Sequence, residues 1–145
     1  MLSAKYFLQL LGSEKQGTII VLSSGAGLLT LPGSSAYTIS KLVDMQLART
    51  LSVENSNILA VAIHPGIVAT DMMSDTFRPF AKDTPLLAGA AAVWLATDAA
   101  KFLNGRFFYA NWDVIEMMAR KAEFEGNDTL QVGLKGNFVT ATVEG

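Results

Sequence analysis

The chain has 145 residues, enough for one domain with a buried core, and half of them are hydrophobic whereas only 17% are charged. A net charge of −2, without any block of lysine or arginine, argues against a nucleic acid or a membrane as partner. With no cysteine and a single histidine, disulfides, thiolate metal sites and histidine clusters are excluded, so we expect no metal.

Helix and strand patterns alternate along the chain. The first two strands are the unbroken apolar runs TIIVL and ILAVAI, which are typical of strands covered on both faces. Ser34 or Ser35 can cap the long helix between them. Residues 74–85 are polar and indicate an exposed loop or a short helix. In chain order we expect a helix over residues 3–11, a strand over 18–22, a helix over 36–53, a strand over 58–63, a helix over 86–97, a strand over 106–111, a helix over 114–125 and a loosely patterned tail over 126–145.

This order indicates a parallel sheet flanked by helices, with right-handed crossovers. Ser24 follows the first strand and residues 65–70 follow the second, so both loops should open on the same edge of the sheet. Tyr37 and Lys41 are four positions apart, which puts both on one face of the helix between those strands. The topology alone therefore brings a hydroxyl, a phenol and an ammonium together.

These motifs in this order, SSGAG after a strand, YTISK on a helix and PGIVAT after the next strand, resemble the short-chain dehydrogenase/reductase family. The resemblance covers residues 18–111, and the tail segment ANWDVIEMMARK is similar to fungal members. It implies an α/β fold, a truncated Rossmann-like, doubly wound parallel sheet of about three strands. It also implies a single domain over residues 1–145, corresponding to the C-terminal half of the family's fold, with residues 112–145 as a substrate lid or tail.

The resemblance implies a catalytic set of Ser24, Tyr37 and Lys41. In the family the tyrosine passes a proton to or from the substrate oxygen, and the serine hydroxyl holds that oxygen. A free phenol with a pKa of about 10 is a poor base at neutral pH, and a nearby ammonium favours its phenolate form. The implied cofactor is NAD(P), held at its nicotinamide end by Tyr37, Lys41, Pro65, Gly66, Ile67 and Thr70.

Each motif also has a simpler interpretation. Ser23 and Ser24 are common turn residues, a tyrosine and a lysine four apart occur on many exposed helix faces, and the Pro65-Gly66 pair ends strands in general. We assign His64, which lies beside that proline, a structural role.

The sequence contains no glycine-rich turn of the form TGxxxGxG, which cradles the adenosine pyrophosphate in complete family members. The N-terminal dinucleotide-binding half is therefore expected to be absent, and we expect NADH and NADPH to bind weakly or not at all. The strand over 18–22 should then have an open edge. A partner that supplies the missing half, pairing of two copies, or repacked helices would each cover it, and we favour a homodimer.

Three functions remain open from the sequence. The chain is an oxidoreductase for a carbonyl or hydroxyl group of a small metabolite, such as a fungal secondary-metabolite intermediate; or a non-redox isomerase, dehydratase or cyclase that reuses the same site; or an inactive interaction subunit of a complete homologue. We expect a cytoplasmic protein. Candidate apolar residues for a substrate pocket, for which core packing is an equal interpretation, are Met72, Met73, Phe77, Phe80, Trp112 and Met117.

Overall fold

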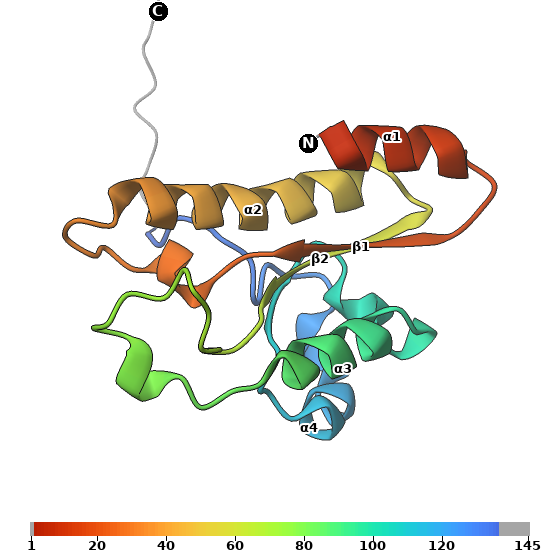
Figure 1. Ribbon diagram of the computed structural model, residues 1–145. Coiled ribbons are helices and arrows are strands. Elements are labelled where there is room, and N and C mark those ends of the chain that lie inside the picture. Colours follow the sequence, from red (N-terminus) through yellow and green to blue (C-terminus); the bar gives the residue numbers. More distant parts are fainter. Residues whose placement is uncertain (1, 137–145) are drawn as a thin grey trace, which may run out of the picture.

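The computed structural model describes residues 2–136, in which three parallel strands form one sheet with helices on both faces (Figure 1). The predicted α/β, Rossmann-like fold is thereby confirmed. The elements are α1 (Leu2–Leu11), β1 (Gly17–Leu22), α2 (Ser35–Glu54), β2 (Ile58–His64), α3 (Pro85–Leu95), β3 (Phe107–Tyr109) and α4 (Val114–Ala119), with four short 3-10 helices, η1 (Gly25–Leu28), η2 (Arg78–Phe80), η3 (Asp98–Leu103) and η4 (Lys121–Phe124).

The strands follow the order β1-β2-β3, so β2 is central. Leu22 of β1 is in register with Ile63 of β2, and His64 of β2 is in register with Tyr109 of β3. The C-terminal ends of all three strands therefore meet at one edge of the sheet. The loops that follow β1 and β2 both begin there, as the alternation of elements predicted.

Helices α1 and α2 cover one face of the sheet, and α3 and α4 lie on the other (Figure 1). The largest fully buried side chains belong to β2, β3 and the α3 side of the sheet, and Ala48 and Met45 of α2 fill the opposite face. The main core cluster consists of Leu59, Val61, Ile63, Ala91, Leu95, Ala100, Leu103, Phe108, Ala110, Met117 and Phe124.

Strand β1 differs from its prediction, because its apolar run was expected to be covered on both faces. Residues 17–21 are only half-buried and Leu22 is 59% exposed. Within residues 2–136, β1 pairs with β2 alone and ends the sheet, so the expected open edge is present. An edge strand has one neighbour, and this is why the same residue pattern is less buried here than in β2.

Two further elements are shorter than predicted. Strand β3 stops at Tyr109 because the chain turns there, with the Trp112 N–H donating to the Tyr109 carbonyl at 3.0 Å. Helix α4 ends at Ala119 and gives way to η4, whose Phe124 packs on Phe102 with ring centroids 5.3 Å apart. The Arg106 guanidinium donates to the Phe124 carbonyl and holds this turn against the sheet.

The described part of the chain contains no helix that combines the length and apolar character needed to cross a membrane. Of the predicted lid or tail over residues 112–145, α4, η4 and the segment up to residue 136 are described, and residues 137–145 lie outside the described residues. The lid function of this segment stays a prediction.

Candidate active site

The turn that carries Ser24 is fixed against helix α2. Ser24 follows β1, caps η1 by accepting from the Ala26 N–H at 3.2 Å, and is only 8% exposed. The neighbouring Ser23 hydroxyl donates to the Lys41 carbonyl at 2.7 Å. A Cβ added to Gly27 would lie 2.8 Å from the Leu42 nitrogen, so η1 lies directly on the backbone of α2. The position of Ser24 relative to α2 is thus set by backbone contacts.

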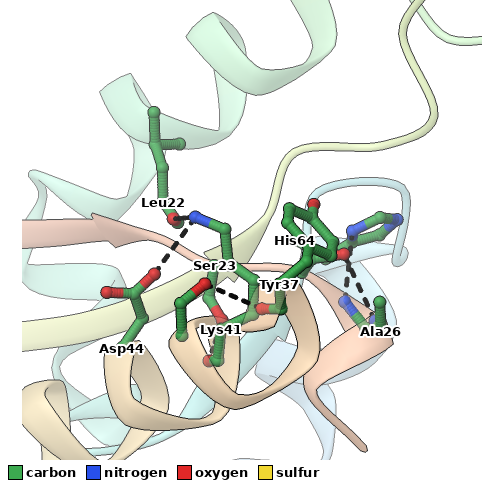
Figure 2. Close-up of polar contacts among 10 residues, drawn as sticks. Leu22, Ser23, Ala26, Tyr37, Lys41, Asp44 and His64 are labelled. Atoms are coloured by element: carbon green, nitrogen blue, oxygen red, sulfur yellow. Dashed lines mark hydrogen bonds and ion pairs between the residues drawn. The ribbon is translucent and has the colours of Figure 1, made fainter. Parts of the chain in front are cut away.

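Helix α2 presents Tyr37 and Lys41 beside that turn. The Lys41 ammonium donates to the Leu22 carbonyl at 2.8 Å and pairs with Asp44 at 3.1 Å (Figure 2). It lies 6.0 Å from the centroid of the Tyr37 ring, which is 44% exposed. An ammonium has three N–H groups, so these two contacts leave one for another acceptor. Among the described residues no hydrogen bond joins Ser24 to Tyr37 or Lys41.

The loop after β2 is held by a side chain from further along the chain. The Ile67 N–H donates to the Asp83 carboxylate at 2.7 Å, and the Asp83 N–H donates to the Ile67 carbonyl at 3.2 Å. Gly66 is buried with φ +95°, and a Cβ there would lie 2.7 Å from the same carboxylate. Pro65 is half-buried and Thr70 is exposed. Of the loop's predicted cofactor-facing groups, the Ile67 N–H therefore already has an acceptor.

The predicted apolar pocket residues do not form one lining. Met117 is buried in the main core cluster and Trp112 packs against it, which supports core packing for both. Met72 is 87%, Phe77 46% and Phe80 60% exposed. A hollow of about 350 Å³ lies between η1 and the start of α2, and it borders none of the candidates. Among residues 2–136, no group of three potential ligands could hold a metal ion.

Three residues that shape the site were not assigned such a role from the sequence: Gly27, Asp44 and Asp83. Asp44 carried a usable signal, because it lies three positions after Lys41 on the same helix. Gly27 and Asp83 act through contacts with residues far along the chain, for which the sequence gives no pattern.

Comparison with known proteins identifies a family for this arrangement. A family model described as short chain dehydrogenase matches residues 1–79. The protein named short chain dehydrogenase mpl6, from the fungus Monascus purpureus, is 41% identical over 132 residues, which cover 88% of this chain and 44% of the relative. The chain thus spans less than half the length of that relative.

Solved structures share the fold. An oxidoreductase of the short chain dehydrogenase/reductase family from Burkholderia thailandensis superposes with a TM-score of 0.65 at 22% identity, over 86% of this chain and 56% of that protein. A 4-hydroxyisoleucine dehydrogenase complexed with NADH gives a TM-score of 0.62 at 24% identity, over 74% of this chain and 50% of that protein.

Proposed function

The chain belongs to the short-chain dehydrogenase family, and from that membership we propose that it carries the proton-transfer site of an oxidoreductase acting on a carbonyl or hydroxyl group of a small metabolite. One observation carries the proposal. The Lys41 ammonium bridges the last carbonyl of β1 and Asp44, 6.0 Å from the Tyr37 ring. This contact supports the proposal, because it holds Lys41 of α2 at the strand end that Ser24 follows, with the Tyr37 ring nearby.

The proposed proton transfer uses three side chains. Ser24 already accepts from the Ala26 N–H, so its own O–H proton is left to donate to the substrate oxygen. Tyr37 gives its phenolic proton to that oxygen when a carbonyl is reduced, and takes a proton from it when an alcohol is oxidised. The positive charge of Lys41 stabilises the phenolate that forms.

The residues present fit the nicotinamide end of NAD(P), which would supply or accept the hydride. The chemistry of the donors supports this fit, because Lys41 keeps one N–H for a ribose hydroxyl and Thr70 offers an exposed hydroxyl. Buried Gly66, with φ +95°, lets the loop backbone turn there without a side chain. The NADH complex of the dehydrogenase with the same fold supports this cofactor class.

A second candidate is proton transfer without hydride, as in an isomerase, a dehydratase or a cyclase. The family resemblance implies that the backbone at Ile67 faces the nicotinamide. The Ile67 N–H, however, already donates to Asp83 at 2.7 Å. Ser24, Tyr37 and Lys41 do not depend on that N–H. In the absence of a nicotinamide, Ser24 would hold the enolate oxygen while Tyr37, as a phenolate beside Lys41, takes a proton from the carbon next to the carbonyl and returns it as the product forms.

Cofactor titration separates the two candidates. NADH and NADPH are titrated into the chain and the nicotinamide fluorescence is followed, with Lys41→Ala as the matched variant. Saturable binding in the low micromolar range that Lys41→Ala weakens would support the oxidoreductase and contradict the non-redox reaction. Binding too weak to saturate would favour the second candidate.

Turnover is then measured on a panel of small ketones and secondary alcohols. Oxidation or reduction of the nicotinamide is read by absorbance, and exchange of the proton next to a carbonyl for deuterium is read by NMR. Tyr37→Phe should remove either activity while circular dichroism shows an unchanged fold, because only the phenolic O–H is lost. A rate equal to that of the unaltered chain would exclude Tyr37 from the mechanism.

We also propose that two copies associate and that the substrate is a fungal secondary-metabolite intermediate. The proposal of a dimer is supported by the open edge of β1 and by exposed apolar side chains on the outer faces of α1 and α2, which are Leu2, Tyr6, Leu10, Ile39 and Val43. The Monascus relative, a fungal short chain dehydrogenase, supports the fungal part of this proposal. Light scattering after size exclusion tests the dimer, and a compact monomer at micromolar concentration would exclude it. A cytoplasmic location stays a prediction.

A further inference from the structure

The Ser24–Gly25 turn rests on two aromatic side chains from neighbouring strands. The Gly25 N–H donates to His64 Nδ1 at 3.4 Å. Figure 2 shows the His64 side chain on the opposite side of the site from the Lys41 ammonium. A Cβ added to Gly25 would lie 2.5 Å from the Tyr109 hydroxyl, so only glycine lets the turn approach this closely. His64 ends β2 and Tyr109 ends β3, and the two are paired in register.

The orientation of the His64 ring is set by its surroundings. Its ring meets that of Tyr109 at a centroid distance of 5.0 Å and an angle of 65°, an edge-to-face contact. Tyr109 in turn packs on Trp112 at 4.9 Å. An imidazole accepts a hydrogen bond at Nδ1 only when it is neutral and carries its proton on Nε2. The contact with Gly25 therefore specifies both the protonation state and the tautomer.

We propose that His64 is a positioning residue for Ser24: its neutral ring, with the proton on Nε2, anchors the Gly25 N–H and so fixes the serine hydroxyl at the sheet edge. Protonation adds an N–H at Nδ1, so that two donors face each other. The hydrogen bond from the Gly25 N–H is then lost. That the anchored hydroxyl serves catalysis rests on the function proposed above. The anchor itself is independent of that function, since it involves no substrate or cofactor.

The pH dependence follows from the groups that face His64. These are Asp83, from the segment before α3, and Tyr109, from β3. Burial lowers the pKa of His64 below its ordinary value of 6.5, and the charge of Asp83 opposes this effect. Because the folded pKa lies below the unfolded one, the anchor is complete above pH 6.5 and is lost as the pH falls through the folded pKa.

The chain has one histidine, so a single imidazole appears in its NMR spectra. We expect nitrogen-15 spectra of the full chain to show the Nε2–H tautomer at neutral pH and a ring midpoint below 6.5. The Gly25 and Ala26 amide signals should shift with that same midpoint. The opposite tautomer, or amide signals that do not follow the ring, would overturn the proposal.

Two variants complete the test. His64→Phe keeps an aromatic ring against Tyr109 but removes the acceptor, so the Gly25 amide should lose its pH-dependent shift and exchange with solvent roughly tenfold faster. His64→Gln, a second variant in case the first does not fold, should lose the same titration. Tyr109→Phe is the matched control, because it keeps the ring contact and should preserve the titration. A pH-dependent Gly25 shift that survives in the folded His64 variants would contradict the proposal, whereas failure of the activity assays alone would not.

Discussion

Strands β1 and β2 are neighbours in the sheet, yet they serve the molecule differently. From Ile58 to Ile63, every residue of β2 is at most 9% exposed, whereas β1 is half-buried and ends in Leu22 at 59%. The core lies mainly on the side of β2, β3 and α3. The candidate catalytic groups lie where β1 meets α2, and they are held by hydrogen bonds and close backbone contacts. Burial of apolar side chains thus stabilises the region of β2, β3 and α3, whereas hydrogen bonds and close backbone contacts position the groups where β1 meets α2.

The largest expected effect comes from removing a large side chain from the core on the β2 and β3 side of the sheet. Phe108 is fully buried, and its ring lies 5.6 Å from Trp94 and 6.0 Å from Trp112. Phe108→Ala should lower the free energy of unfolding by about 3–5 kcal/mol, because it removes apolar contacts and leaves a cavity. Urea unfolding followed by circular dichroism measures this loss, since tryptophan fluorescence would itself respond to the change beside both rings.

Leu22→Ala is the matched control on β1. Its side chain is more than half exposed, so the loss should be below about 1 kcal/mol. Equal losses for the two variants would show that the edge of β1 is covered in solution, and would remove the contrast between the strands.

The second effect concerns the close approach of η1 to α2. A Cβ on Gly27 would lie 2.8 Å from the Leu42 nitrogen and 2.9 Å from the Lys41 carbonyl carbon, both of them backbone atoms that cannot move aside. Gly27→Ala should therefore cost about 1–3 kcal/mol of stability, as overpacking does elsewhere. Gly89 of α3 has open space around it, so Gly89→Ala should instead stabilise the helix by about 0.5–1 kcal/mol. Thermal unfolding of both variants gives the sign of each change.

A gain of stability in Gly27→Ala would mean that η1 does not lie on the backbone of α2. The serine turn would then have no fixed position relative to Tyr37, and the proposed site would lose its geometric basis.

The third effect concerns the loop after β2. Removing the Asp83 carboxylate takes away the acceptor of the Ile67 N–H, so Asp83→Ala should lose roughly 1–2 kcal/mol of stability. Asp83→Asn keeps a carbonyl oxygen in the same place and should lose less than half as much. Hydrogen exchange at the Ile67 amide reads the contact directly. An amide equally protected in Asp83→Ala and in the unaltered chain would exclude the contact.

Much of this arrangement can be predicted from the sequence, because it depends on local pattern and topology. The apolar runs and the residues that end them give the strands, and the order of elements gives the parallel sheet and its functional edge. That Tyr37 and Lys41 share one face of α2 follows from their four-residue spacing and helix geometry. The expectation that these residues converge with Ser24 at that edge rests on the same topology, and their joint action stays a prediction.

The remaining features depend on contacts between residues far apart along the chain. An apolar run such as TIIVL can form either an edge strand or a central strand. The partial exposure of β1 therefore cannot be deduced from this run alone. Asp83 lies in a polar segment that indicates an exposed loop, and its contact with Ile67 spans sixteen positions. His64 and Gly25 meet across 39 positions. Such pairs become visible only when the strands are placed in register.

The smallest expected effect tests how the polar region is held together. Lys41 and Asp44 form a partly exposed ion pair, with side chains 24% and 28% accessible, and the Leu22 carbonyl binds the same ammonium. Asp44→Asn leaves that carbonyl in place, so stability should fall by no more than about 0.5 kcal/mol, and less at high salt, because partly exposed pairs are weak and screened. Thermal unfolding at low and high salt measures this difference. A markedly larger loss would mean that Asp44 and the Leu22 carbonyl hold Lys41 as one cooperative unit, and that the region of β1 and α2 owes more of its stability to polar contacts than its comparison with β2 implies.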